Sequence, residues 1–139
     1  MTNIRNVPEQ SDSERHINKV SKEVVASAIE VHRNLGPGLL ESAYEACLAF
    51  ELRERGLAVE HQKPLPVVYR DVTVEVGYRL DLLVEDAVVV ELKSVERLEP
   101  IHQAQLLSYL KLSGYKLGLL INFNVRLLKH GIKRIANKL

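Results

Sequence analysis

Two charged side chains interrupt a stretch that otherwise has the composition of a buried strand. The segment "DAVVVELKSVERL" (residues 86–98) contains three consecutive valines, followed by Glu91 and Lys93. Side chains alternate between the two faces of a strand, so Glu91 and Lys93 share one face and Val90 and Leu92 the other. A charge buried without a partner costs several kcal/mol. The two charges therefore need a partner on their face, such as an opposite charge, a metal ion or a ligand.

An aspartate on the preceding strand is expected to face this pair. The segment "VTVEVGYRLDLLVEDAVVVELKSV" (residues 72–95) is typical of two strands joined by a turn at Glu85 and Asp86. A hairpin centred on Asp86 sets Asp81 directly opposite Glu91, where Cβ atoms are about 4.5–5.5 Å apart. Two carboxylates at this separation repel each other unless a proton or a metal ion lies between them. The prediction depends on the register, because a slip of one residue turns side chains to the other face.

The residues alone leave two interpretations of these charges open. In the first, Asp81 and Glu91 bind a hard cation such as Mg²⁺ or Mn²⁺, which prefers oxygen ligands. Lys93 would then hold a water or stabilise charge that develops on a phosphate. In the second, the same residues and Arg79 form a cross-strand salt-bridge network on a solvated face of the sheet. The apolar character of both strands around the charges favours the first.

Composition limits the class of protein. The chain has 139 residues, 46% hydrophobic and 27% charged, which predicts one globular domain. Cys47 is the only cysteine, which excludes an intramolecular disulfide and a cysteine-rich zinc or iron–sulfur site built by this chain alone. We expect a cytoplasmic protein with no membrane partner, since the sequence lacks a long apolar run and a signal-peptide pattern. The basic segment 126–139 either contacts phosphates or is a solvated end of the chain.

Hydrophobic spacing predicts helices on either side of a group of strands. Apolar residues recur at helical intervals from Ile17 to Leu35, and Ser11 or Ser13 could cap that helix. The sequence "LGPG" (residues 35–38) then ends it. The expected elements are a flexible start over 1–14, helices over 15–34 and 39–55, strands between 57 and 95, a helix within 98–114, a buried strand within 115–124, and helical turns over 125–139. This order predicts an α/β (α+β mixed) fold, a central mixed sheet flanked by helices, in one domain over residues 15–139.

Several motifs of the sequence resemble those of a known group of enzymes. "RLDLLVE…VVVELK" is similar to the Asp…Glu-x-Lys core of the PD-(D/E)xK nuclease superfamily. "GLLESAY" (residues 38–44) matches the signature of the small bacterial GxxExxY proteins placed in that superfamily, and "VHRNLGPG", "LSYLKLSG" and "GLLINF" also resemble them. The resemblance covers roughly residues 20–135. It implies a restriction-endonuclease-like core and metal-dependent hydrolysis of nucleic acid, with DNA favoured over RNA.

The resemblance also implies roles for individual residues. Asp81 and Glu91 would be metal ligands for Mg²⁺ or Mn²⁺, with the backbone carbonyl of Leu92 as a third ligand. Glu41, on the second helix, would complete the acidic site as the helical glutamate does in RecB-like nucleases. Lys93 would be the catalytic lysine.

Two further residues and one alternative follow from the same resemblance. Gln105 and Tyr109 form a Gln-x-x-x-Tyr pattern similar to one that follows Glu-x-Lys in RecB-like nucleases. Their i,i+4 spacing puts both on one helical face, where they would contact the site or a phosphate of the substrate. Leu80 stands where the superfamily name has Pro. The alternative is a catalytically silent nucleic-acid-binding or regulatory module of the same fold, and a homodimer is compatible with either.

Other polar residues have structural roles as the simplest expectation. We expect His32 to make a structural hydrogen bond and Tyr44 to be a core aromatic with a satisfied hydroxyl. Glu45 is either a second acidic group near the site or a solvated side chain. His61 is expected to be an ordinary surface residue.

Overall fold

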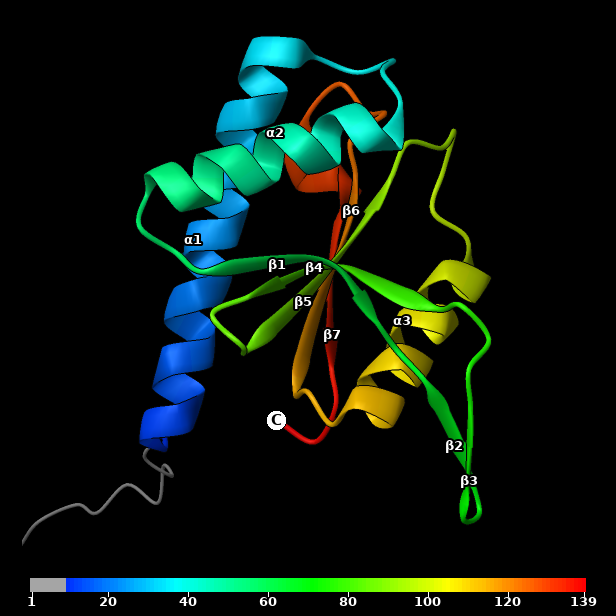
Figure 1. Ribbon diagram of the computed structural model, residues 1–139. Helices are drawn as coiled ribbons and strands as arrows, with labels where there is room; N and C mark the ends of the chain where they lie inside the picture. The colour runs from blue at the N-terminus through cyan, green and yellow to red at the C-terminus, as the bar shows by residue number, and fades with distance from the viewer. Residues whose placement is uncertain (1–9) are drawn as a thin grey trace, which may run out of the picture.

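A five-stranded mixed sheet lies at the centre of the computed structural model, which describes residues 10–139 (Figure 1). Its strand order is β1-β4-β5-β6-β7, and only β5 and β6 run parallel to each other. A separate two-stranded sheet is formed by β2 and β3. In chain order the elements are α1 (Asp12–Leu35), α2 (Glu41–Glu54), β1 (Val59–Pro64), β2 (Val67–Tyr69), β3 (Val72–Val74), β4 (Arg79–Val84), β5 (Val88–Lys93), α3 (Pro100–Ser113), β6 (Leu117–Asn122), the 3-10 turn η1 (Leu128–Gly131) and β7 (Ile132–Ala136). The predicted mixed sheet with flanking helices is confirmed.

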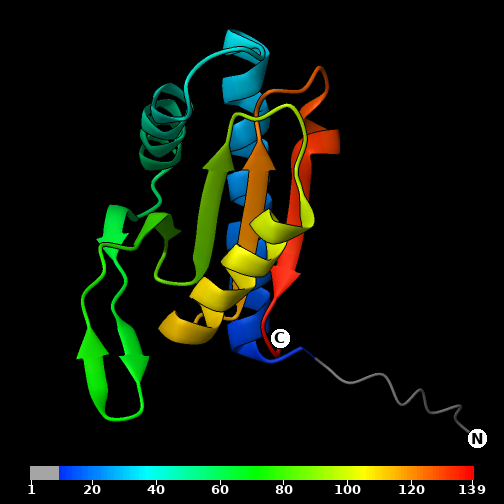
Figure 2. The ribbon, with the colours of Figure 1, turned by 90° about the vertical axis from the view of Figure 1, so that its right-hand side faces the viewer.

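Helices cover both faces of the sheet (Figure 2). α1 and α2 pack on one face, where buried residues of both helices form one hydrophobic cluster with alternate residues of β4, β5 and β6. α3 packs on the other face in a smaller cluster, and it connects β5 to the parallel strand β6. Gly118 on β6 allows this close packing, because a Cβ there would lie only 2.9 Å from Leu106 Cδ2 of α3. The parallel pair is therefore buried on both faces, as parallel strands generally are.

The first helix begins close to the predicted position. Ser11 caps α1, since its Oγ accepts a hydrogen bond from the backbone N–H of Glu14 at 3.1 Å. The helix starts at Asp12 rather than at residue 15, so the last part of the start that we expected to be flexible is helical. Residues 1–9 lie outside the described part of the chain.

The last segment of the chain corrects a prediction. Residues 125–139 were expected to form helical turns, but they form η1 and then β7, which pairs antiparallel with β6. Leu119 of β6 lies opposite Arg134 and Ile121 opposite Ile132. β6 is wholly buried, so its backbone groups on that side need partners that water cannot supply. Strand pairing with distant residues therefore overrides the helix-like spacing of the segment.

Candidate active site

The β4–β5 hairpin has the register that the sequence predicts. Leu82 pairs with Val90 and Val84 with Val88. Asp81 and Glu91 are the next residues on each strand, one position further from the turn than the last pair. Beyond that point the two carboxylates bind backbone N–H groups of the opposite strand. The backbone N–H of Asp81 donates to Glu91 Oε1 at 3.1 Å, and that of Leu92 donates to Asp81 Oδ2 at 3.0 Å. The two acidic side chains therefore lie together between the ends of the strands.

Glu91 is a buried carboxyl next to a second carboxylate. Its exposed fraction is only 6%. Burial is the largest cause and the negative charge of Asp81 the next, and together they raise the pKa of Glu91 to about 8, while Lys93 opposes the shift weakly. A carboxyl with this pKa binds a proton near neutral pH, because the ionised pair lacks a compensating positive charge. A bound cation would supply that charge.

The salt-bridge interpretation of these charges is wrong. Within residues 10–139, no ion pair of 4.0 Å or less joins Asp81 or Glu91 to Arg79 or Lys93. Arg79 turns instead to the backbone of β1, where its Nη1 donates to the carbonyl of Gln62 at 3.2 Å. Lys93 is partly buried at the end of β5. Among the described residues, the acidic side chains of the hairpin are therefore not neutralised by ion pairs.

Glu41 is the first residue of α2 and borders a hollow beside Asp81. The loop after β5 fixes the start of this helix, because Ser94 Oγ donates to the carbonyl of Leu39 at 2.6 Å. The backbone N–H of Ser94 also donates to Glu41 Oε1, at 3.4 Å. The hollow has a volume of about 650 Å³, and its lining residues are Leu39, Leu40, Glu41, Ser42, Glu45, Gln62, Asp81 and Ser94. Three carboxylates from α2 and β4 therefore face one cavity.

Side-chain contacts of Gln62 and His61 beside this cavity were not predicted from the sequence. The Nε2 of Gln62, on β1, donates to Glu45 Oε1 at 3.0 Å, to Glu45 Oε2 at 2.9 Å and to Asp81 Oδ1 at 3.2 Å. His61 is exposed, as expected of a surface residue, and its ring also contacts the Glu45 carboxylate, which the sequence did not predict. Burial is the main cause that raises the pKa of Glu45. Glu45 follows Glu41 by four residues on the same helical face and lines the cavity, so of the two expectations for it the acidic group near the site is confirmed.

The donor set fits a hard divalent cation. No three His, Cys, Asp or Glu side chains within residues 10–139 form a ready-made metal cage. Mg²⁺ does not require one, because it commonly keeps several waters and binds one or two carboxylates. The paired carboxylates of Asp81 and Glu91 meet that requirement. In addition, one N–H₂ group of Gln62 already has three carboxylate oxygens around it, which is the environment that a small cation prefers.

Gln105 and Tyr109 lie together on α3. Gln105 Nε2 donates to the Tyr109 hydroxyl at 3.1 Å, and the Tyr109 ring lies 5.7 Å from that of Tyr78. Burial is the main cause that raises the pKa of Tyr109, and the nearby charge of Glu91 is the next. The Tyr109 hydroxyl is therefore close enough to the carboxylate pair to sense its charge.

Two expectations about structural side chains are confirmed. The Nε2 of His32 forms a hydrogen bond with the carbonyl of Val125 at 2.7 Å. The hydroxyl of Tyr44 donates to the carbonyl of Gly36 at 2.6 Å and accepts from the backbone N–H of Leu39 at 3.1 Å, while its ring stacks on Phe123 at 4.5 Å. Tyr44 thereby holds the loop that leads to Glu41.

A comparison with protein-family models identifies the class of this domain. The model described as the PD-(D/E)XK nuclease superfamily matches residues 18–135. The chain belongs to this superfamily, whose members are generally nucleases that use divalent metals. Comparisons with curated proteins and with solved structures each gave no match. Among the described residues, no helix is long and apolar enough to cross a membrane.

Proposed function

We propose that this protein is a metal-dependent nuclease that hydrolyses phosphodiester bonds of DNA in preference to RNA. The observation that carries the proposal is the carboxylate pair of the half-buried Asp81 and the buried Glu91, which no ion pair within the described chain neutralises. Lys93 follows Glu91 on the same face of β5. Membership of the chain in a superfamily of nucleases supports the assignment.

The residues would divide the chemistry as follows. Asp81, Glu91 and the carbonyl of Leu92 hold Mg²⁺ or Mn²⁺, and Glu41 completes the acidic site from α2. When bound, the metal lowers the pKa of a water and offsets charge on the scissile phosphate. Lys93 orients the attacking water and stabilises the negative charge that develops on the phosphate oxygens.

Substrate contact is the role that we propose for Gln105 and Tyr109. Both carry hydrogen-bond donors, which can bind phosphate oxygens of the strand and set its position. Their mutual hydrogen bond fixes the Tyr109 hydroxyl on the side of the sheet that α3 covers. These contacts would be independent of base identity, because phosphates carry no sequence information.

We further propose that the protein is a RecB-like member of the bacterial GxxExxY family. The motif "GLLESAY" supports this, since its Glu41 borders the acidic cavity and its Tyr44 orders the preceding loop. A cytoplasmic location, a single domain over residues 15–139 and a homodimer belong to the same proposal.

A second candidate is a catalytically silent nucleic-acid-binding or regulatory module. The observation that favours it is the Gln62 side chain, whose amide occupies a position among the carboxylates of Glu45 and Asp81. If Gln62 were fixed there, it would compete with a cation. Such a module would bind nucleic acid in a salt-dependent way and would cleave none with Mg²⁺ or Mn²⁺ present.

The deciding experiment is a cleavage assay on purified wild type and Lys93→Ala. DNA and RNA strands of one sequence are incubated with Mg²⁺, Mn²⁺ or EDTA. We expect metal-dependent cleavage of DNA by the wild type and its loss in Lys93→Ala, because the variant lacks the charge that stabilises the transition state. Lys22→Ala, which removes an exposed lysine on α1, is the matched control and should keep full activity. Full activity of a folded Lys93→Ala would contradict the assignment.

A further inference from the structure

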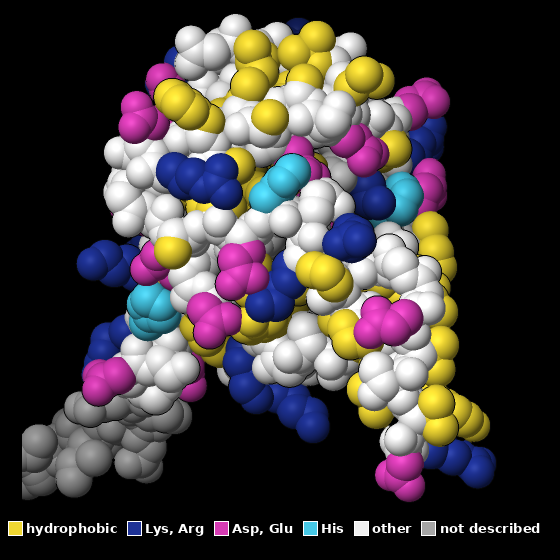
Figure 3. Space-filling view, viewed as in Figure 1, with side chains coloured by type: hydrophobic (Ala, Val, Ile, Leu, Met, Phe, Trp, Pro, Cys, Tyr) yellow, Lys and Arg dark blue, Asp and Glu magenta, His cyan; other side chains and the backbone are white. Residues whose placement is uncertain are grey.

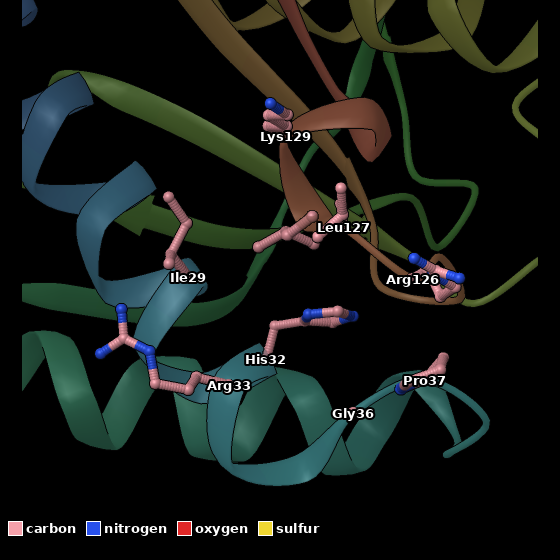
Figure 4. A pocket seen from close by; sticks show the side chains of 9 residues that line it. Ile29, His32, Arg33, Gly36, Pro37, Arg126, Leu127 and Lys129 are labelled. Carbon is pink, nitrogen blue, oxygen red and sulfur yellow. The ribbon is translucent and has the colours of Figure 1, made fainter.

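A second cavity, of basic rather than acidic character, lies beside the loop that leads to Glu41. Its volume is about 510 Å³, and it is bounded by the end of α1, the start of that loop and the segment that enters η1 (Figure 4). The lining residues are Ile29, His32, Arg33, Gly36, Pro37, Arg126, Leu127, Leu128 and Lys129. None of them is acidic, and three carry a full positive charge.

The cations of this cavity are not equivalent. Arg33 already binds Glu30, since its Nη1 lies 2.9 Å from Glu30 Oε2, and in Figure 4 its guanidinium points away from His32. Arg126 and Lys129 are exposed, and neither forms an ion pair with another residue within positions 10–139. Arginine and lysine side chains without an ion-pair partner are the side chains that commonly bind phosphate groups.

The rest of the cavity suits a flat apolar group. The side chains of Ile29, Pro37 and Leu127 line it together with the ring of His32, which occupies the centre of the view in Figure 4. His32 is held in place, because its Nε2 is bound to the carbonyl of Val125, the residue directly before Arg126. A nucleotide combines these two features, since it has a flat base for the apolar wall and a phosphate for the cations.

The loop between α1 and α2 separates this cavity from the acidic one. Gly36 and Pro37 line the basic cavity, while Leu39 and Leu40 line the acidic hollow. An extended chain spans at most about 3.6 Å per residue, so Pro37 and Leu40 are within about 11 Å of each other. Nucleotides of one strand rise by about 3.4 Å each along a duplex, so a single strand of a few nucleotides reaches from one cavity to the other.

We propose that the basic cavity binds one nucleotide of the same strand whose scissile phosphate lies at Asp81 and Glu91. The base packs against His32 and Leu127, and a neighbouring phosphate binds Arg126 and Lys129. This inference rests on the proposed nuclease function for the identity of the ligand. It assigns to the segment after β6 a role in binding the nucleic-acid strand at a position away from the reacting atoms.

The first test measures binding without cleavage. A fluorescein-labelled single strand of 12 deoxynucleotides is titrated in EDTA at several salt concentrations, and fluorescence anisotropy gives the affinity. For single strands, each lost phosphate contact reduces the slope of log affinity against log salt by about 0.7. We expect Arg126→Ala/Lys129→Ala to weaken binding and to reduce that slope by about 0.7–1.4, corresponding to one or two lost contacts. The matched control Lys19→Ala/Lys22→Ala removes two exposed lysines of α1 and should leave the slope unchanged.

Because this assay needs no catalysis, its outcome separates the cavity from the active site. If the wild type cleaves no nucleic acid, the nuclease proposal is refuted. If the double variant of that same protein binds DNA more weakly than the wild type, the nucleotide site is still supported. Unchanged affinity and slope in the double variant would overturn the nucleotide site even if wild type cleaves DNA.

The second test asks whether the cavity recognises the base as well as the phosphate. Backbone amide shifts are followed by NMR while thymidine monophosphate or inorganic phosphate is added to the wild-type protein. We expect the nucleotide to shift the amides of Gly36, Leu127 and Leu128 at lower concentrations than phosphate does. Equal shifts from both ligands would mean a bare anion site and would overturn the proposal, as would the absence of shifts from either.

Discussion

Two antiparallel strand pairs of this protein each contain side chains that do not match their surroundings. β4–β5 is buried yet contains Asp81 and Glu91 at its end, and the exposed fraction of Glu91 is 6%. β2–β3 is exposed yet consists largely of apolar residues, with exposed fractions of 64% for Tyr69 and 59% for Val72. The comparison shows that a hairpin's position in the fold, more than its composition, decides what it buries.

The position of each hairpin explains the difference. β4 and β5 are inner strands between β1 and β6, so both faces and both edges are covered. β2 and β3 pair only with each other and extend away from the body of the protein, with hydrophobic side chains along the arm at the lower right of Figure 3 (Figures 2 and 3). A buried carboxyl beside a second carboxylate, as at Glu91, is costly and calls for a functional reason. Exposed apolar residues are common on surfaces and by themselves call for none.

The largest expected effect is on catalysis, and it compares one aspartate from each hairpin. Asp81→Ala should reduce metal-dependent cleavage to background, because it removes a proposed metal ligand. Asp71→Ala, in the exposed turn between β2 and β3, removes the same group and should leave the rate unchanged. Both variants are assayed on the same DNA strand, and circular dichroism checks that each is folded. Equal activity of the two variants would remove the functional distinction between the hairpins.

The next effect is on stability and concerns the apolar residues of the buried hairpin. Leu82 is fully buried in the cluster beneath α1 and α2. Leu82→Ala should lower the free energy of unfolding by about 2–5 kcal/mol, because it removes buried methyl groups and leaves a cavity. Urea unfolding followed by circular dichroism measures the change. A loss below about 1 kcal/mol would mean that the hairpin is less tightly packed than its burial indicates.

A further effect on stability is expected from pH in the metal-free protein. The pKa of Glu91 is raised to about 8 in the folded protein, from 4.5 for an ordinary glutamate. A raised folded pKa means that stability from this group is complete below about pH 4.5 and declines as the pH rises toward 8. The melting temperature in EDTA should therefore fall over this range in wild type, and less steeply in Glu91→Gln. Parallel pH profiles for the two proteins would show that Glu91 is ionised throughout.

The smallest effect is expected on the exposed hairpin. Val68→Ser replaces an exposed valine of β2 and should change the free energy of unfolding by less than about 0.5 kcal/mol, because the side chain loses little burial. The same urea assay used for Leu82→Ala gives the value. A loss above about 2 kcal/mol would show that the arm is packed against something in solution, such as a second copy of the chain.

The sequence predicted the parts of the site that depend on local patterns. The turn at Glu85 and Asp86 defines the register of β4 and β5, so the meeting of Asp81 and Glu91 followed from counting residues. Ser11, one of the two candidate caps, does cap α1, although the helix begins three residues earlier than predicted. Such features involve residues that are close along the chain, and the residue preferences of helix caps and hairpin turns predict them well.

The parts that the sequence missed depend on contacts between distant segments. Gln62 joins Glu45 to Asp81 only because β1 pairs with β4, and nothing near Gln62 indicates this. The contact of His61 with Glu45 was missed for the same reason. β7 was taken for helical turns because its pairing with β6, rather than its own spacing, sets its structure.

Isothermal calorimetry of Mn²⁺ binding tests the central claim most directly. Mn²⁺ is titrated into wild type, Asp81→Asn and Asp71→Asn, each previously treated with EDTA and exchanged into metal-free buffer. The account predicts saturable binding in wild type and in Asp71→Asn, and its loss in Asp81→Asn, because only Asp81 lies beside Glu91. No saturable binding in wild type, or equal binding in all three proteins, would contradict a metal site between β4 and β5.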